Sequence, residues 1–183
     1  MTRFGKLPVL VLLLALAALV AALFGALLPQ LSYSVGPTHF ESLVFPQAGI
    51  DPGESPRFAA TQAGLQAAWW IGPIVTLPAF LFGFASVPRT ETYLAAGLGA
   101  IGLVFVLATF AALIGLVAGI AADATGLIDP FITVPDGPMR SEFLRAGFMH
   151  DGAYVAAGLG LLVAFWPMVR ARRIDNARLG GAA

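Results

Sequence analysis

Residues 93–122 read YLAAGLGAIGLVFVLATFAALIGLVAGIAA, an apolar run without a single Asp, Glu, Lys, Arg or His. Residues 7–28, 65–87 and 152–169 form three further runs of the same kind. A helix needs roughly 20 such residues to cross the ~30 Å hydrocarbon core of a bilayer, whereas a helix on the surface of a soluble protein carries a polar face. The four runs therefore predict an all-α fold, a four-helix bundle integral to a membrane.

The composition favours one small membrane domain. The chain has 183 residues, of which 58% are hydrophobic and 11% charged, against roughly 25% charged in soluble domains. We expect a single domain over residues 1–183, with loops at 29–64 and 123–151 and a tail at 170–183. The formal net charge of zero predicts no nucleic-acid partner, and a sequence without Cys excludes disulfides and thiolate chemistry.

Basic and acidic side chains segregate along the chain. Seven of the ten Lys and Arg residues lie before the first run, in the link 88–92 or after the fourth run, whereas eight of the ten Asp and Glu residues lie in the two loops. By the positive-inside rule, both termini are cytoplasmic and both loops external. Because Arg far outnumbers Lys, as in GC-rich bacterial genomes, we expect a multi-pass protein of a bacterial inner membrane.

The first loop is expected to carry a short helix. Thr38 and Glu41 have the spacing of a capping box, in which the hydroxyl accepts from the amide three residues on and the carboxylate reaches back. The helix that follows is expected to end before Pro46, because proline lacks an amide donor.

Two long helices are expected to begin before they enter the membrane. The Ser-Pro pair at 55–56 is a helix start signal for the second run. Asp136 as the N-cap and Pro138 as the first residue would begin the fourth helix, on which Phe143 and His150 then fall near one face. We therefore expect the bundle to extend beyond the outer leaflet.

Aromatic residues mark the expected membrane interfaces. Trp69 and Trp70 lie where the second run meets the outer interface, and Tyr93 and Trp166 lie at the inner one. Such amphipathic rings are enriched at these depths, so we interpret all four as interface anchors and not as a cofactor site.

Pro73 and Pro78 fall inside the second run and are expected to kink its helix. The kink either shapes the helix for packing or bends a transport path. Polar residues that could line such a path are Gln62, Gln66, Thr76 and Thr109.

Small residues recur every fourth position, a spacing that lets membrane helices approach closely. Gly115 and Gly119 also give an oligomerisation signal. The full series are Ala18, Ala22 and Ala26 in the first run, Ala111, Gly115 and Gly119 in the third, and Gly152, Ala156, Gly160 and Ala164 in the fourth.

The candidates for metal chemistry are His39, Glu41, His150 and Asp151. If the two loops converge, two imidazoles and two carboxylates would suit a divalent ion such as zinc. The spacing is not that of a known metal motif, and the alternative is that these residues satisfy loop backbone and helix caps. We expect no other cofactor and assign no catalytic residue.

The stretch LSYSVGPTHFESLVFPQAGI at residues 31–50, followed by Trp69-Trp70 and by Thr92-Tyr93-Leu94, resembles a family of bacterial four-span membrane proteins. That resemblance implies a fold and a compartment and no activity. Its polar string 32–47 is the expected partner-binding surface. The residues chosen for it are Tyr33, Pro37, His39, Phe40, Phe45 and Gln47.

Three functional classes follow. The leading one is a non-enzymatic accessory, assembly or structural subunit of a larger membrane complex, with the lipid bilayer and other membrane subunits, or copies of itself, as partners. The second is a small transporter or oligomeric channel, which the absence of charge within the runs disfavours. The third is a membrane enzyme or metal-binding protein that uses the four candidate ligands.

Overall fold

A computed structural model describes residues 3–53 and 55–180, and the regular structure of this part is entirely helical. Residues 54 and 181–183 of the predicted loop and tail lie outside it. The α-helices are α1 Leu7–Val35, α2 Pro37–His39, α3 Phe45–Ala48, α4 Pro56–Ala68, α5 Ile71–Ser86, α6 Thr90–Thr125, α7 Pro138–Val163 and α8 Phe165–Gly180, with a 3-10 turn at Arg3–Lys6 and a π-helical turn at Phe40–Val44.

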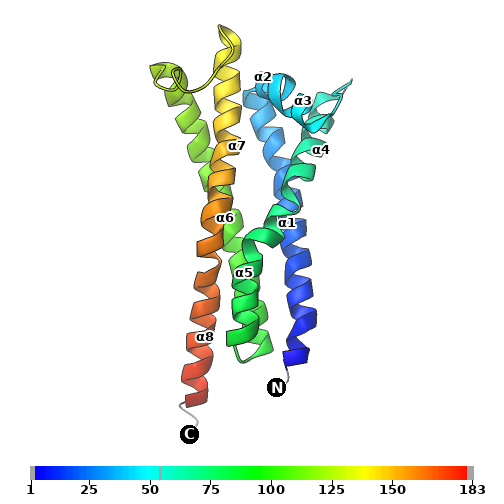
Figure 1. The fold of residues 1–183 in the computed structure, drawn as a ribbon, viewed down its shortest axis with the longest axis vertical. Coiled ribbons are helices and arrows are strands. Elements are labelled where there is room, and N and C mark those ends of the chain that lie inside the picture. The colour runs from blue at the N-terminus through cyan, green and yellow to red at the C-terminus, as the bar shows by residue number, and fades with distance from the viewer. Residues whose placement is uncertain (1–2, 54, 181–183) are drawn as a thin grey trace.

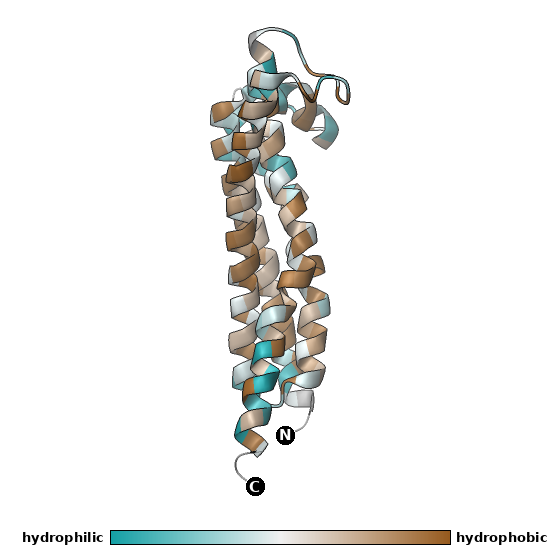
Figure 2. Cartoon of the chain, turned by 90° about the vertical axis from the view of Figure 1, so that its left-hand side faces the viewer, coloured by the Kyte–Doolittle hydropathy of each residue, from teal (hydrophilic) through white to brown (hydrophobic). Residues whose placement is uncertain are grey.

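Four helical units are long and apolar enough to cross a membrane: α1, α4 with α5, α6, and α7 with α8. The predicted all-α class and the presence of four long apolar helices are confirmed. The units run side by side, and the described ends of the chain lie at one end of the bundle (Figure 1), here called the terminal end. The other end, called the loop end, carries α2, α3 and residues 126–137. Hydrophilic residues gather at both ends (Figure 2).

The helices are longer than the apolar runs. At 1.5 Å per residue, the 36 residues of α6 extend about 54 Å, well beyond a ~30 Å core. As predicted, α4 begins at Pro56 and α7 begins at Pro138. The N-cap of α7, however, is Gly137 at φ 69° and not Asp136, and the tail predicted after residue 169 continues as helix to Gly180.

The second span is broken where the sequence predicts a kink. α4 ends at Ala68, α5 begins at Ile71, and Pro73 removes the amide that the Trp69 carbonyl would otherwise accept from. Pro78 lies inside α5 without ending it. The break changes the neighbours of the span, because α4 packs along α1 whereas α5 packs along α1, α7 and α8.

Small residues hold the helices together within one chain. A Cβ on Gly115 would lie 2.0 Å from the Phe148 carbonyl oxygen, so α6 and α7 cross with their backbones in contact. Gly115 and Gly119 are buried by α7, and the predicted oligomerisation signal is instead an intrachain contact. On α1 the packing ridge is shifted by one residue from the predicted one, to Ala17, Ala21 and Gly25, which face Gly72 and Gly64.

Tyr93 is not an interface anchor, which corrects the sequence-based interpretation. Its ring is fully buried and its hydroxyl donates to the Phe80 carbonyl at 3.2 Å. Gly83 makes room for it, since a Cβ there would lie 3.0 Å from the ring. Trp69, Trp70 and Trp166 are 53%, 46% and 59% exposed, as lipid-facing anchors must be.

The terminal end is organised by two buried ionisable side chains. The Lys6 ammonium donates to the carbonyls of Phe84, at 3.2 Å, and Val87 at the C-terminus of α5. The fully buried Asp175 carboxylate accepts from the Arg89 amide at 3.0 Å and the Thr92 hydroxyl at 2.9 Å at the N-terminus of α6. Each charge complements the dipole of the helix end that it meets.

A stacked histidine pair above an apolar cavity

Residues 37–48 form a nearly continuous helical segment that folds over the loop end and stops at Gly49, whose φ is 64°. The predicted capping box is not formed. Thr38 instead donates its hydroxyl to the Glu142 carboxylate of α7 at 2.7 Å, while Glu41 accepts from the Tyr33 hydroxyl at 3.2 Å. The segment runs through Pro46, so the predicted end before that residue is wrong. Pro46 lies in the first turn of α3, where a missing amide is tolerated, and α3 packs against α4.

His39 and His150 meet beneath this segment. Their rings stack with centroids 5.5 Å apart and an interplanar angle of 26°. His39 is 6% exposed, its ring lies edge-on to Phe143, and a Cβ on Gly147 would lie 3.3 Å from it. The Nε2 atom of His150 is 3.0 Å from the Ser32 hydroxyl of α1. The pair therefore joins α1, α2 and α7.

His39 is uncharged at neutral pH. Burial lowers its pKa to about 4, with a smaller contribution from the neighbouring charge of His150. Its Nδ1 atom is buried and has no hydrogen-bond partner. A neutral imidazole tolerates this environment, because protonation would place a charge among aromatic rings.

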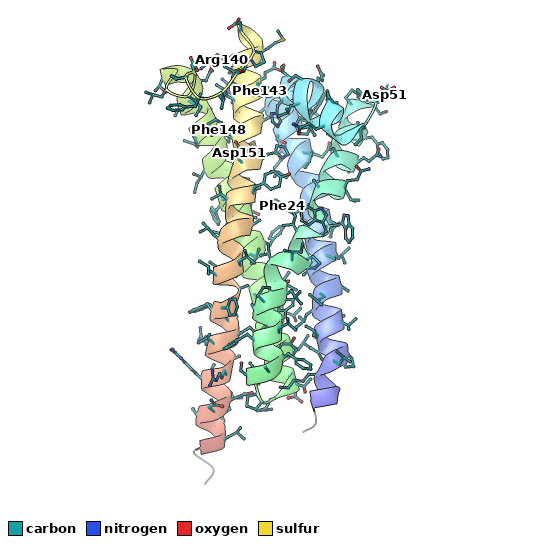
Figure 3. The ribbon with its side chains drawn as sticks, in the orientation of Figure 1. Phe24, Asp51, Arg140, Phe143, Phe148 and Asp151 are labelled. Atoms are coloured by element: carbon teal, nitrogen blue, oxygen red, sulfur yellow. The ribbon has the colours of Figure 1, made fainter. Side chains whose placement is uncertain are left out.

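The structure brings together two of the four predicted metal ligands. His39 and His150 stack, whereas Glu41 is exposed beside Tyr33 and Asp151 is exposed on α7 (Figure 3). Within residues 3–53 and 55–180, no group of three or more His, Cys, Asp or Glu side chains could hold a metal ion. The predicted convergence of all four does not occur there, because Glu41 and Asp151 point to other faces of their helices.

Most of the predicted partner-binding residues face the protein's own core. Phe40 and Phe45 are 0% and 2% exposed and pack with the half-buried ring of Tyr33. His39 is buried, Pro37 is half-buried, and of this set Gln47 is exposed. The polar string predicted to bind a partner is thus mainly a cap on the bundle, and its sequence pattern reflects packing against α4 and α7.

A cavity of about 120 Å³ lies below the histidine pair, between α1 and α4 on one side and α6 and α7 on the other. Its polar lining residues are Thr76, His150 and Tyr154, and the rest of the lining is apolar, including Phe24, which Figure 3 labels between these helix pairs. Of the residues proposed for a transport path, Thr76 lines the cavity, whereas Gln62 and Gln66 are exposed on α4. A continuous polar path is not formed by that set.

Sequence reasoning placed Phe143 and His150 on one face of the fourth helix, and this is the face that meets His39. It included Ser32 as the first residue of the polar string 32–47 but did not predict that this residue is fully buried and bonded to His150. The signal for Ser32 was weak, since a serine near a helix end is usually a surface residue. The cavity had no sequence signal of its own beyond the proline kink.

Family models, curated proteins and solved structures were compared with this chain, and none matches.

Proposed function

We propose that the protein is a non-enzymatic accessory, assembly or structural subunit of a bacterial inner-membrane complex, with both termini cytoplasmic. The observation that carries this proposal is an exposed apolar loop at residues 126–137, here called the distal loop. Leu127 and Phe131 are 76% and 80% exposed, and Met139 just after the loop is 54% exposed. Exposed apolar groups clustered in this way are typical of protein interaction sites.

The position of the distal loop argues for a protein partner and against lipid. α6 begins beside the charged residues Arg89 and Glu91, which fit one membrane boundary. Its length of about 54 Å leaves roughly 20 Å beyond a ~30 Å core. Leu127 and Phe131 follow the far end of this helix, above the acyl chains. Another subunit of the complex would remove them from water.

The distal loop is held in one conformation. The Arg140 guanidinium forms ion pairs with Asp123, at 3.2 Å, and with Asp129. The Phe131 amide donates to the Ile128 carbonyl at 2.9 Å. A preorganised loop loses little conformational entropy on binding, which favours a specific contact.

The other two functional classes have less support. A transporter needs polar groups along a path, and the lining of the cavity has three polar side chains, Thr76, His150 and Tyr154, among otherwise apolar residues. A metal enzyme needs more ligands than the histidine pair supplies, and none join it within the described residues.

Site-specific photo-crosslinking in cells tests the proposal. A benzophenone amino acid at Phe131 should give one discrete adduct with another membrane protein, whereas the same group at Asp136, exposed on the same loop, should not. The double variant Leu127→Ser, Phe131→Ser should lose the same polypeptide on purification in mild detergent. An adduct of two copies of this chain, equal labelling from both positions, or no adduct would overturn the proposal.

A further inference from the structure

We propose that the cavity beneath His150 binds one hydrocarbon chain of a membrane glycerolipid. This inference is independent of the subunit role proposed above, because it rests on the helix break in the second span and on the lining of the cavity.

The lining of the cavity on α1 is about as long as one leaflet's share of the bilayer core, whereas the volume of the cavity corresponds to a short section of one chain. Its lining on α1 runs from Ala17 to Pro29, a rise of about 18 Å at 1.5 Å per residue, against roughly 15 Å for half of a ~30 Å core. Its volume of about 120 Å³ is slightly below that of an engineered protein cavity of about 150 Å³ that holds one benzene molecule. A narrow section of one chain fits, and two chains side by side do not.

The helix break creates the opening through which a chain can enter. α4 follows α1, whereas α5 stays against α7, so α4 and α7 diverge above Ile71 (Figure 1). Ala67, Ala68 and Ile71 line one side of the cavity, and Tyr154, which is 53% exposed, lines the other. The cavity therefore reaches the lipid-facing surface between these helices.

The other sides of the cavity are consistent with entry of a chain between α4 and α7. On the side between α1 and α6, the rings of Phe24 and Phe105 meet edge to face with centroids 5.8 Å apart. Trp69 and Trp70, which follow the lining residue Ala68, are exposed beside the opening. Exposed Trp pairs favour the boundary between headgroups and chains, so the opening lies where a chain leaves its glycerol group.

The lining selects a hydrocarbon chain over a polar solute. It contains no Asp, Glu, Lys or Arg, and the Thr76 hydroxyl already donates to the Gly72 carbonyl at 2.8 Å. His150 at the upper end is bonded to Ser32 and stacked on the uncharged His39. An apolar cavity of this kind excludes water and gains by apolar filling. Without a cationic group, it gives no preference for an anionic headgroup.

Lipid retention tests the site directly. The full chain is reconstituted with dioleoylphosphatidylcholine, exchanged into detergent and analysed by native mass spectrometry. The unmodified protein should retain about one lipid per chain, and Ala157→Phe, which fills the cavity, should retain at least about 10-fold less. The matched control Val155→Phe is on the lipid-facing side of the same helix and should retain as much as the unmodified chain. Phosphatidylglycerol with the same chains should be retained equally.

A second measurement keeps the test valid if the Ala157→Phe variant fails to fold. Phosphatidylcholine with a diazirine on its acyl chain is photolysed with the unmodified protein in vesicles. Labels should concentrate on residues 64–76 and 150–157 rather than on the exposed face of α1. Even labelling of all lipid-facing helices, retention unchanged by Ala157→Phe, or no retained lipid on the unmodified protein would overturn the proposal.

Discussion

The two ends of the bundle bury polar side chains in opposite ways. At the terminal end, Lys6 and Asp175 are buried against helix ends, and both contact backbone groups that have no partner within their own helix. At the loop end, the buried His39 and the half-buried His150 pack against helix sides and aromatic rings, and one nitrogen of His39 has no partner. A buried ionised side chain is thus accommodated at the ends of helices, whereas an imidazole that packs against the sides of helices stays neutral.

This difference predicts that the two ends of the bundle respond differently to substitution and to acid. The terminal end should depend on the presence of its charged side chains. The loop end should depend on the neutrality of its imidazoles and respond to acid strongly. Three experiments test this difference between the two ends, and they are given in order of decreasing expected effect.

Removal of the Asp175 carboxylate should have the largest effect. Asp175→Ala leaves the Arg89 amide and the Thr92 hydroxyl without their acceptor, and two bonds to an ionised group together contribute about 4 kcal/mol. The free energy of unfolding, measured by SDS titration in mixed micelles, should fall by that amount. Asn176→Ala, at the exposed neighbouring position, should change it by less than about 0.5 kcal/mol. Equal effects of the two variants would remove the special role of the helix end.

Acid should destabilise the loop end through His39. The ordinary pKa of 6.5 applies to the unfolded chain and a pKa of about 4 to the folded one, so the unfolded state binds more protons between these values. Stability should be constant above pH 6.5 and fall by about 3 kcal/mol as the pH drops to 4. Limited proteolysis of the segment 37–53 across this range reports the change. His39→Phe should lose the part of the pH dependence that His39 contributes and keep the part that arises from His150, and an unaltered profile in that variant would refute the assignment.

The tether between α2 and α7 should have the smallest effect. Thr38→Val removes the hydroxyl donor to Glu142, a bond of about 1 kcal/mol at this partly exposed site. The rate of proteolysis after residue 48 should rise about five-fold, since 1 kcal/mol is a factor of five in the opening equilibrium. Ser42→Ala, which removes an exposed hydroxyl of the same segment, is the control. A comparable rise in both variants would mean that the tether does not hold the segment.

The general architecture was predictable and the roles of individual residues were less so. The four spans, the early start of α4 and the break before Pro73 follow from run length and from the missing proline amide. Tyr93 was misassigned because an aromatic residue at the end of a run fits both an interface and a core position. The decisive fact was the neighbouring Gly83, which lies ten residues away in sequence and in another helix.

The candidate site was only partly predictable, again because contacts between helices that are distant in sequence decide the role of each residue. Composition pointed to the polar string in the first loop, but the direction of each side chain depends on which helix lies below it. Phe40 and Phe45 turned inward because α4 and α7 cover them. Asp175 was an ordinary tail residue in the sequence and proved to be a buried cap, because α8 brings it to Arg89, the N-cap of α6, which is 86 positions away.

The four apolar helices follow from the sequence alone, because an uninterrupted apolar run of about 20 residues has the length of a membrane-crossing helix, in which every backbone hydrogen bond is made within the segment. Tertiary structure alone decided which small residues touch, which imidazoles stack and where a cavity opens. In a chain that is apolar on all faces, periodicity does not mark the inner face of a helix. Close packing of side chains and backbone selects that face, and with it the site.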